Sequence, residues 1–243
     1  KSRKDRPQRS PLYQADPNIE KMWSDIFYPD NPKRREQLIR KNQELQDYMK
    51  SNFLATNELI DVMNKHLCCS FNHITLIETA TLQENCDVMI GCIHEIQAVV
   101  EKIDKELKEK LEPTLYEKLR NKGLSAEDFT VISKIIEGVC GIATAGSITL
   151  VGLLIDKGII LANIASKCAL IAASTLASVG LAAVFLGIDM IVEAILGSIE
   201  RDQLKAALEE YDRVLEDFGP ASHQYQYNIT YVTIKIEEIQ NQV

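Results

Sequence analysis

Residues 131–199 read VISKIIEGVCGIATAGSITLVGLLIDKGIILANIASKCALIAASTLASVGLAAVFLGIDMIVEAILGSI. This stretch contains two runs without a formal charge, Gly138–Ile155 with 18 residues and Cys168–Ile188 with 21. A helix needs about 20 apolar residues to cross the hydrocarbon core of a bilayer. The second run reaches that length and the first lies at its lower edge, so the stretch predicts either membrane segments or the buried core of a helical protein.

Small residues and the placement of charge favour a membrane-competent helical hairpin. Eight of the chain's 11 glycines lie in residues 131–199, and small residues allow close approach of membrane helices. Charged residues occur only at the ends of the two runs or between them. We expect Asp156–Lys167 to form the tip and Lys134 to lie close to Asp189 at the base. The membrane segment would include Gly138, Ile155, Cys168, Ala173, Ala177, Gly180 and Ile188.

The region before the apolar stretch carries a heptad pattern. After a basic tail, which we expect to be disordered, Asn31 is suited to cap a helix and Pro32 to occupy its first position. The helix is predicted to end near Leu67. Its core positions, alternately four and three residues apart, are Leu38, Asn42, Leu45, Met49, Asn52, Thr56, Leu59 and Met63. The polar residues among them weaken a helix pair but specify its register.

Residues 68–81 interrupt the heptad pattern and predict an irregular connector. His66, Cys68, Cys69 and His73 lie near one another in sequence, but their spacing does not match a zinc-ligand pattern. We therefore expect no metal site and interpret them as core or loop residues. A second helix follows and ends at Pro113. Its core positions are Cys86, Met89, Ile93, Ile96, Val100, Ile103 and Leu107.

Two further heptad segments follow the apolar stretch. Gly219-Pro220 is expected to break the helix between them. The predicted core positions are Leu204, Leu208, Tyr211, Leu215 and Phe218 in the first segment and Tyr225, Ile229, Val232, Ile236 and Ile239 in the second. Apolar stripes must be covered, so we expect the C-terminal helices to pack onto the N-terminal ones.

The predicted fold is therefore all-α, an elongated antiparallel helical bundle whose heptad-patterned helices flank a central apolar hairpin. Four regions are expected: a basic tail with a short anchor (residues 1–31), N-terminal heptad helices (32–130), the apolar hairpin (131–199) and C-terminal heptad helices (200–243).

Composition excludes several functions. The net charge of −8 argues against binding nucleic acid. Six irregularly spaced cysteines and the lack of a secretory signal favour an intracellular, membrane-associated protein. Four scattered histidines form no catalytic pattern, so we expect no enzyme activity, no cofactor and no small-molecule substrate. The Asp189–Glu193 pair is better explained as a helix-end charge cluster than as catalytic carboxylates.

Several motifs resemble those of one known family. They are FYPDNPKRRE (27–36), ENCD (84–87), LEPTLYEKL (111–119), GIDMI (187–191) and AILG (194–197). From residue 27 onward the chain is similar to the single-pass membrane and coiled-coil domain-containing protein 3 family. The resemblance implies a coiled coil and one membrane span, Cys168–Ile188, and it carries over no established catalytic activity or ligand. The need to bring both flanking regions together favours a hairpin instead.

Two functions remain from the sequence. The first is a non-enzymatic protein that places its apolar hairpin in or on a lipid bilayer, permanently or on a trigger, in the manner of α-helical pore-forming proteins. The second is a soluble helical scaffold whose hairpin is simply its core and whose partner is another helical protein or a second copy. Solubility without detergent distinguishes a constitutive span from both a triggered and a scaffold role.

Overall fold

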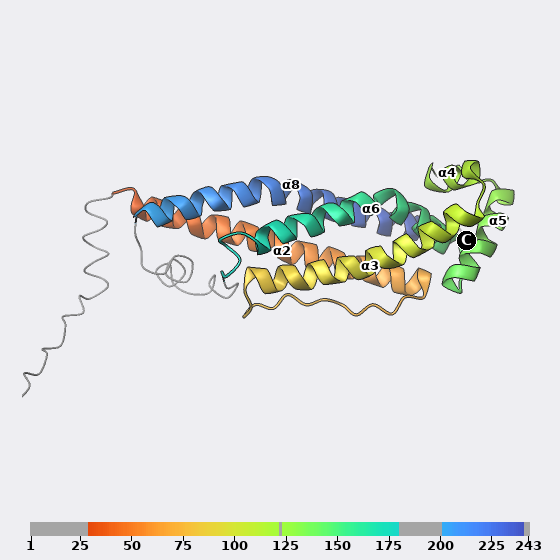
Figure 1. Cartoon of the computed structure of the whole chain (residues 1–243), viewed down its shortest axis with the longest axis horizontal. Helices are drawn as coiled ribbons and strands as arrows, with labels where there is room; N and C mark the ends of the chain where they lie inside the picture. Colours follow the sequence, from red (N-terminus) through yellow and green to blue (C-terminus); the bar gives the residue numbers. More distant parts are fainter. Residues whose placement is uncertain (1–28, 122, 180–200, 241–243) are drawn as a thin grey trace, which may run out of the picture.

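The computed structural model describes residues 29–121, 123–179 and 201–240. Six helices are described: α2 (Asn31–Leu67), α3 (Leu82–Lys110), α4 (Pro113–Asn121), α5 (Ala126–Cys140), α6 (Ala145–Ala172) and α8 (Arg201–Gln240). The all-α prediction is confirmed. Four long helices form an elongated bundle, and the short helices α4 and α5 lie together at one end (Figure 1).

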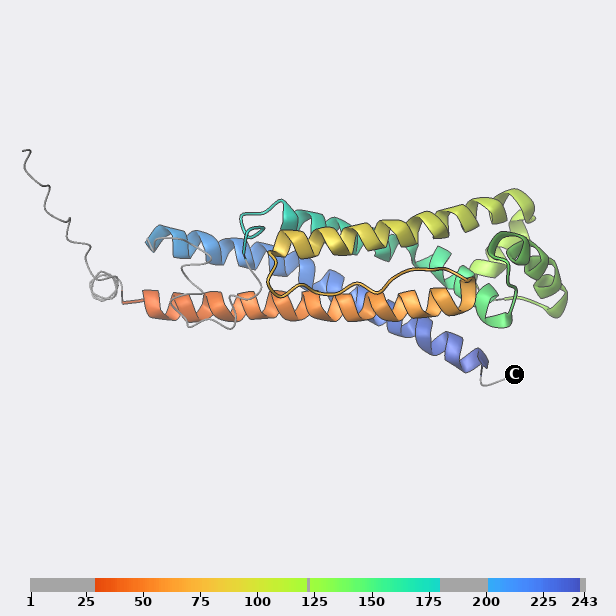
Figure 2. The same ribbon diagram turned by 90° about the horizontal axis from the view of Figure 1, so that it is seen from below.

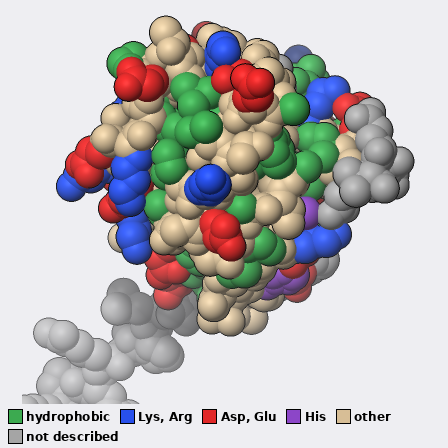
Figure 3. Space-filling model, turned by 90° about the vertical axis from the view of Figure 1, so that its right-hand side faces the viewer, with side chains coloured by type: hydrophobic (Ala, Val, Ile, Leu, Met, Phe, Trp, Pro, Cys, Tyr) green, Lys and Arg blue, Asp and Glu red, His purple; other side chains and the backbone are tan. Residues whose placement is uncertain are grey.

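Helix packing follows an open sequence of neighbours, in which α2 packs on α8, α8 on α6 and α6 on α3. The expected return of the C-terminal region onto the N-terminal helix is therefore confirmed. The predicted core positions of α2 and α3 are all buried, as are most of those of α8. Figure 3 shows the end of the bundle, where hydrophobic side chains are interspersed with charges of both signs.

The helix directions correct one part of the predicted fold. The residue numbers of the α2–α8 contacts increase together along both helices, from Asn42 with Tyr211 to Thr56 with Tyr225. These two helices are therefore parallel. Helix α6 runs against α8, since Lys167 pairs with Asp217 while earlier α6 residues lie beside later α8 residues. The bundle is thus antiparallel only where α6 meets its neighbours.

The polar positions of the α2 seam all find partners on α8. The hydroxyl of Tyr211 donates to Asn42 Oδ1 at 3.0 Å, and Asn52 Nδ2 donates to the Ser222 hydroxyl at 2.9 Å. The hydroxyls of Thr56 and Tyr225 are 2.7 Å apart. Because a buried polar group without a partner is costly, these pairs stabilise one register of α2 on α8, as the sequence predicted.

The predicted irregular connector, residues 68–81, runs back along the bundle in an extended conformation. It begins at Cys68, whose left-handed backbone (φ 51°) ends α2. It ends where Thr81 and Glu84 form a capping box at the start of α3. In Figure 2 it lies between α2 and α3 along most of their shared length. The return makes α2 and α3 parallel.

The turns of the predicted apolar hairpin were placed at the wrong positions. Residues 156–167, the expected tip, lie inside the continuous helix α6. The break falls earlier, where Gly141 adopts φ 73°, a conformation that favours glycine, and ends α5. A second change of direction begins after Ala172. Asp156 and Lys157 do not require a turn, because the helix holds one exposed and the other half-buried at its surface.

The expected break at Gly219-Pro220 is also absent, since α8 continues through Pro220. Proline removes one backbone hydrogen bond and crowds the preceding turn, but here its ring is exposed. Its neighbours Phe218 and Ala221 are buried in the core. Packing on both sides of the proline therefore keeps the helix intact.

Candidate functional site: the apolar helix α6

Helix α6 is the described part of the apolar stretch on which the functional predictions depend. It begins at a capping box in which the Thr144 hydroxyl accepts from the Ser147 N–H and the Ser147 hydroxyl accepts from the Thr144 N–H. Among the described residues it is the one helix long and apolar enough to cross a membrane, with a mean hydropathy of 1.8 over 18 residues. Within the bundle, 56% of that window is buried, as in the core helix of a soluble protein.

One side of α6 is exposed and almost uncharged. Ile159 has 78% of its side chain exposed and Leu170 has 49%. Of the other exposed residues of α6, Ala162, Ser166 and Ala169 are small and Asp156 carries the one charge. A helix that keeps large apolar side chains exposed at the surface of a bundle is compatible with a second apolar environment.

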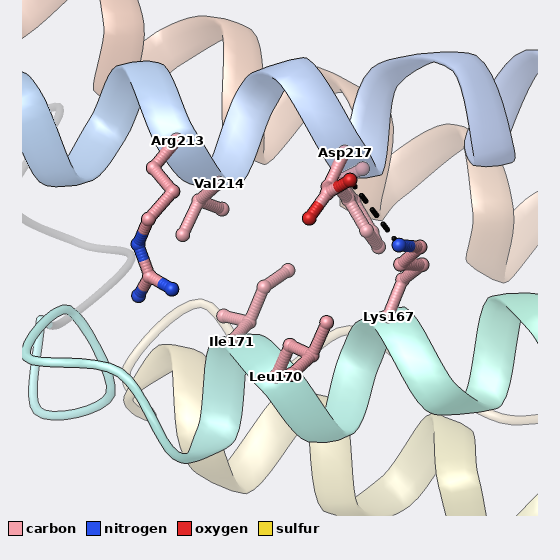
Figure 4. Close-up of a pocket in the computed structure, with 7 residues that line it drawn as sticks. Lys167, Leu170, Ile171, Arg213, Val214 and Asp217 are labelled. Atoms are coloured by element: carbon pink, nitrogen blue, oxygen red, sulfur yellow. Dashed lines mark ion pairs between the residues drawn. The ribbon is translucent and has the colours of Figure 1, made fainter.

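The charges of α6 lie within the helix rather than at its ends. Lys157 Nζ pairs with Asp156 Oδ2 at 3.1 Å near the middle of the helix. Figure 4 shows Lys167 reaching across to Asp217 of α8, an ion pair of 3.3 Å, with Arg213 pointing toward the same gap. The cavity beneath has a volume of about 20 Å³, too small for more than a water molecule. It is an interhelical packing gap, not a ligand pocket.

The first turn of α6 is packed against His66 of α2. A Cβ on Gly146 would lie 2.8 Å from His66 Nδ1, so the ring and the helix backbone are in close contact. His66 is buried, and this desolvation lowers its pKa below the ordinary value, with the neighbouring Lys65 charge acting in the same direction. The neutral imidazole is thus the form that suits the folded bundle.

A second close approach joins α6 to α4. A Cβ on Gly152 would lie 2.6 Å from the Leu119 carbonyl oxygen, closer than such atoms pack. Leu119 is itself buried against the bundle. Glycine at this position therefore allows the backbone of α4 to lie directly on α6, which encloses the N-terminal half of the apolar helix.

Two buried thiols connect α6 to α3. Cys86 and Cys168 are both fully buried. The interaction with the Cys168 thiol, together with burial, holds the pKa of Cys86 well above its ordinary value. Both cysteines are free, so the C-terminal half of α6 is held to α3 by packing and not by a covalent bond.

The predicted membrane residues are divided among different environments. Gly138 is exposed on α5, Ile155 is half-buried in the middle of α6 and Cys168 is buried. Ala173 is the residue that follows α6, and Ala177 lies in the turn beyond it. Gly180 and Ile188 lie outside the described residues.

Only one residue of the ion pair predicted at the hairpin base, Lys134, is among the described residues. Lys134 is exposed on α5, but Asp189 lies outside the described residues. The segment after α6 has a different role, because the carbonyls of Ala177 and Val179 accept hydrogen bonds from the first N–H groups of α3.

The cysteine and histidine residues near the connector form no metal site in the part of the chain described here. His66 faces α6, whereas His73 Nε2 lies 2.7 Å from Asp61 Oδ1 at the surface. Sequence reasoning missed a different polar group, the asparagines 57, 64 and 85 that bind the connector. The seven-residue interval between the first two is the signal that could have identified them.

Comparison with known proteins gives a family but no activity. The family described as "Protein of unknown function (DUF4533)" matches residues 34–193, which is more than half of the chain and includes most of α2 and all of α3 to α6. No solved structure matches the fold.

Proposed function

Since the chain belongs to the DUF4533 family, whose description gives no activity, we propose from the properties of α6 that it is a non-enzymatic helical protein that associates with membranes on a trigger. The observation that carries the proposal is the combination of an apolar α6 and an exposed apolar side on it, centred on Ile159. The resemblance to the single-pass membrane and coiled-coil domain-containing protein 3 family supports a membrane role in general, although the span that it implies, Cys168–Ile188, lies mostly beyond α6.

The trigger follows from how α6 is packed. More than half of its apolar window is buried against α3, α4 and α8, so a bilayer can receive this surface only after those contacts open. The Asp156–Lys157 pair lies near mid-helix, and each charge at a bilayer centre costs about 2.5–3.5 kcal/mol. Lying in the interface is therefore favoured over spanning. Asp156 is about 60° from Ile159 around the helix, so in this orientation its carboxylate lies at the level of the lipid headgroups.

Flotation with liposomes tests the proposal directly. The purified chain is mixed with vesicles containing anionic lipid and centrifuged through a density gradient. Binding of the wild type is expected, and Ile159→Glu should weaken it by roughly tenfold or more, because the new charge must remain out of the apolar layer. Ile159 is largely exposed, so the substitution leaves the core of the bundle intact.

Leu54→Glu provides the matched control. Leu54 is 59% exposed on α2, away from the apolar helix, and receives the same change of charge. Equal binding by wild type, Ile159→Glu and Leu54→Glu would show that α6 does not contact lipid. A wild type that stays at the bottom of the gradient at every lipid composition would remove the membrane role itself.

A scaffold function is the second candidate, and the buried polar network favours it. The pairs formed by Asn42, Asn52 and Thr56 specify one arrangement of α2 on α8, as in a bundle that presents a fixed surface. If the chain is a scaffold, we expect it to be monodisperse without detergent and not to bind lipid. Its partner would be a helical protein or a second copy.

A further inference from the structure

The α2–α3 seam differs from the other three sides of the bundle. Three pairs of helices pack directly on one another: α2 with α8, α8 with α6, and α6 with α3. The backbones of α2 and α3, in contrast, rarely come close to each other. One described link between them is the Thr56 hydroxyl, 3.6 Å from Met89 Sδ. Figure 2 shows the extended connector lying in this seam. The fourth side of the bundle is therefore closed by a strand-like segment and not by helix packing.

Three asparagines bind the connector through its backbone. Asn64 accepts from the N–H and donates to the carbonyl of Phe71, with both distances 2.9 Å. Asn57 makes the same pair with Ile74, also at 2.9 Å. Asn85 of α3 repeats it on Ile77 at 2.8 and 3.0 Å. Each primary amide thus satisfies both backbone groups of one connector residue.

The intervals explain why the arrangement repeats. Asn57 and Asn64 are seven residues apart on α2, which is about 10.5 Å of helix. Phe71 and Ile74 are three residues apart, which is about 10 Å of extended chain. The two spacings match, so a straight helix can hold every third residue of an extended peptide that runs antiparallel to it.

The side chains of the connector supply the apolar part of the contact. Phe71, Ile74 and Leu76 are partly buried against the main core. The asparagine side chains bond only to backbone N–H and C=O groups, which every non-proline residue carries. The seam therefore has the features of a peptide groove: amide clamps for an extended backbone and an apolar floor for selected side chains.

We propose that the α2–α3 seam is a groove for an extended polypeptide, and that residues 71–77 occupy it as a strap whose release opens the bundle and frees α6. The helices form an open chain of neighbours that ends at α2 and α3, so removing the strap allows these two ends to separate first. The contacts of α6 with α3, α4 and α8 must then open in turn before α6 is free. The strap stands on its own geometry, whereas the release of α6 rests on the proposed membrane function.

Hydrogen exchange of the native chain tests the strap without any substitution. The amides of Phe71, Ile74 and Ile77 are expected to be protected, whereas those of Asn72, His73 and Thr75 exchange rapidly. Protection at every third residue is not produced by a helix or by a mobile loop. Uniform exchange across residues 70–78, measured by NMR, would overturn the strap.

A double variant tests the release. Asn57→Ala combined with Asn64→Ala should lower the protection of Phe71 and Ile74 by about tenfold or more. It should keep protection at Ile77, which is held from α3, and should increase the fraction of chain that floats with anionic vesicles.

Asn72→Ala is the matched control for the double variant, because Asn72 is exposed in the same connector. It should change neither exchange nor flotation. Periodic protection with flotation unchanged in the double variant, while the wild type floats, would overturn the gating role and leave the membrane function standing. Periodic protection in a chain that never floats would remove the membrane function, and with it the release of α6, but leave the strap.

Discussion

At the scale of single residues, two glycines of α6 show how local contacts determine the effect of a substitution on stability. Gly152 lies directly under the Leu119 carbonyl of α4, where an added Cβ would be 2.6 Å from the oxygen. Gly158, about two turns later on the same helix, has no neighbouring heavy atom within 4 Å of that position. Both glycines lie inside α6, so only their surroundings distinguish them.

Alanine at these two positions should therefore have opposite effects. Gly152→Ala is expected to lower the free energy of unfolding by about 1–3 kcal/mol, because α4 must move away. Gly158→Ala should raise it by up to about 1 kcal/mol through helix propensity. Urea denaturation followed by circular dichroism measures both. Equal effects of the two substitutions would contradict the close contact between α4 and α6.

The buried imidazole of His66 makes stability depend on pH. Its pKa is lowered in the folded chain, relative to an ordinary value of 6.5, so the unfolded chain binds a proton more readily. This contribution to stability is complete above pH 6.5 and is lost as the pH falls toward the lowered pKa.

His66→Gln should therefore flatten the decrease in stability below pH 6.5. The measurement is the midpoint of urea unfolding for wild type and variant at pH 7.5, 6.5 and 5.5. Parallel pH profiles for the two proteins would show that His66 does not contribute to the slope.

At the scale of elements, α8 shows that packing can override a strong local signal. Gly219-Pro220 is unfavourable inside a helix, yet α8 is continuous from Arg201 to Gln240. The ring of Pro220 points to solvent, while Phe218 and Ala221 are held in the core. The break is avoided because both halves of the helix are buried against the same neighbours, α2 and α6.

Pro220→Ala should accordingly stabilise the chain. The substitution restores a backbone N–H that can bond to the preceding turn, and proline costs up to about 3 kcal/mol against alanine in a helix. An increase in melting temperature is expected, measured by circular dichroism at 222 nm. A decrease would indicate that the bundle depends on the altered geometry at the proline.

At the scale of the whole molecule, the direction of the helices replaces the hairpin as the organising feature. Placing the C-terminal helix on α2 was expected to require both ends of the apolar stretch on one side. Parallel packing removes this requirement, because α8 then begins beside the start of α2, as the ion pair between Lys41 and Asp212 shows. Helix α6 runs back toward that end, antiparallel to α8.

Thiol labelling can report whether α6 leaves this bundle. Exposed Cys68 should react with a maleimide at once, whereas fully buried Cys86 and Cys168 should react only after opening. With anionic vesicles, the labelling rate of Cys168 should increase by about tenfold or more if α6 is released. Mass spectrometry of peptides identifies each site. If Cys168 stays protected from labelling in chains that are bound to vesicles, the bundle binds the membrane without opening.

The heptad pattern alone was sufficient to predict which faces are buried. In α2 and α3 the predicted core positions are all buried, and α2 ends at Leu67 as predicted. These features are local, because helix periodicity and end chemistry depend on residues within a few turns. The polar seam residues also predicted a specified register, although their partners on α8 were not known.

Tertiary structure decided the direction of each helix, the position of the turns and the role of the connector. A heptad stripe is the same whichever way its helix runs, so periodicity cannot distinguish parallel from antiparallel neighbours. Asp156 and Lys157 resemble a turn in sequence, but a surface position on α6 accommodates them. The asparagines of α2 acquire their function only because an extended segment lies beside them, which depends on the return path of the chain.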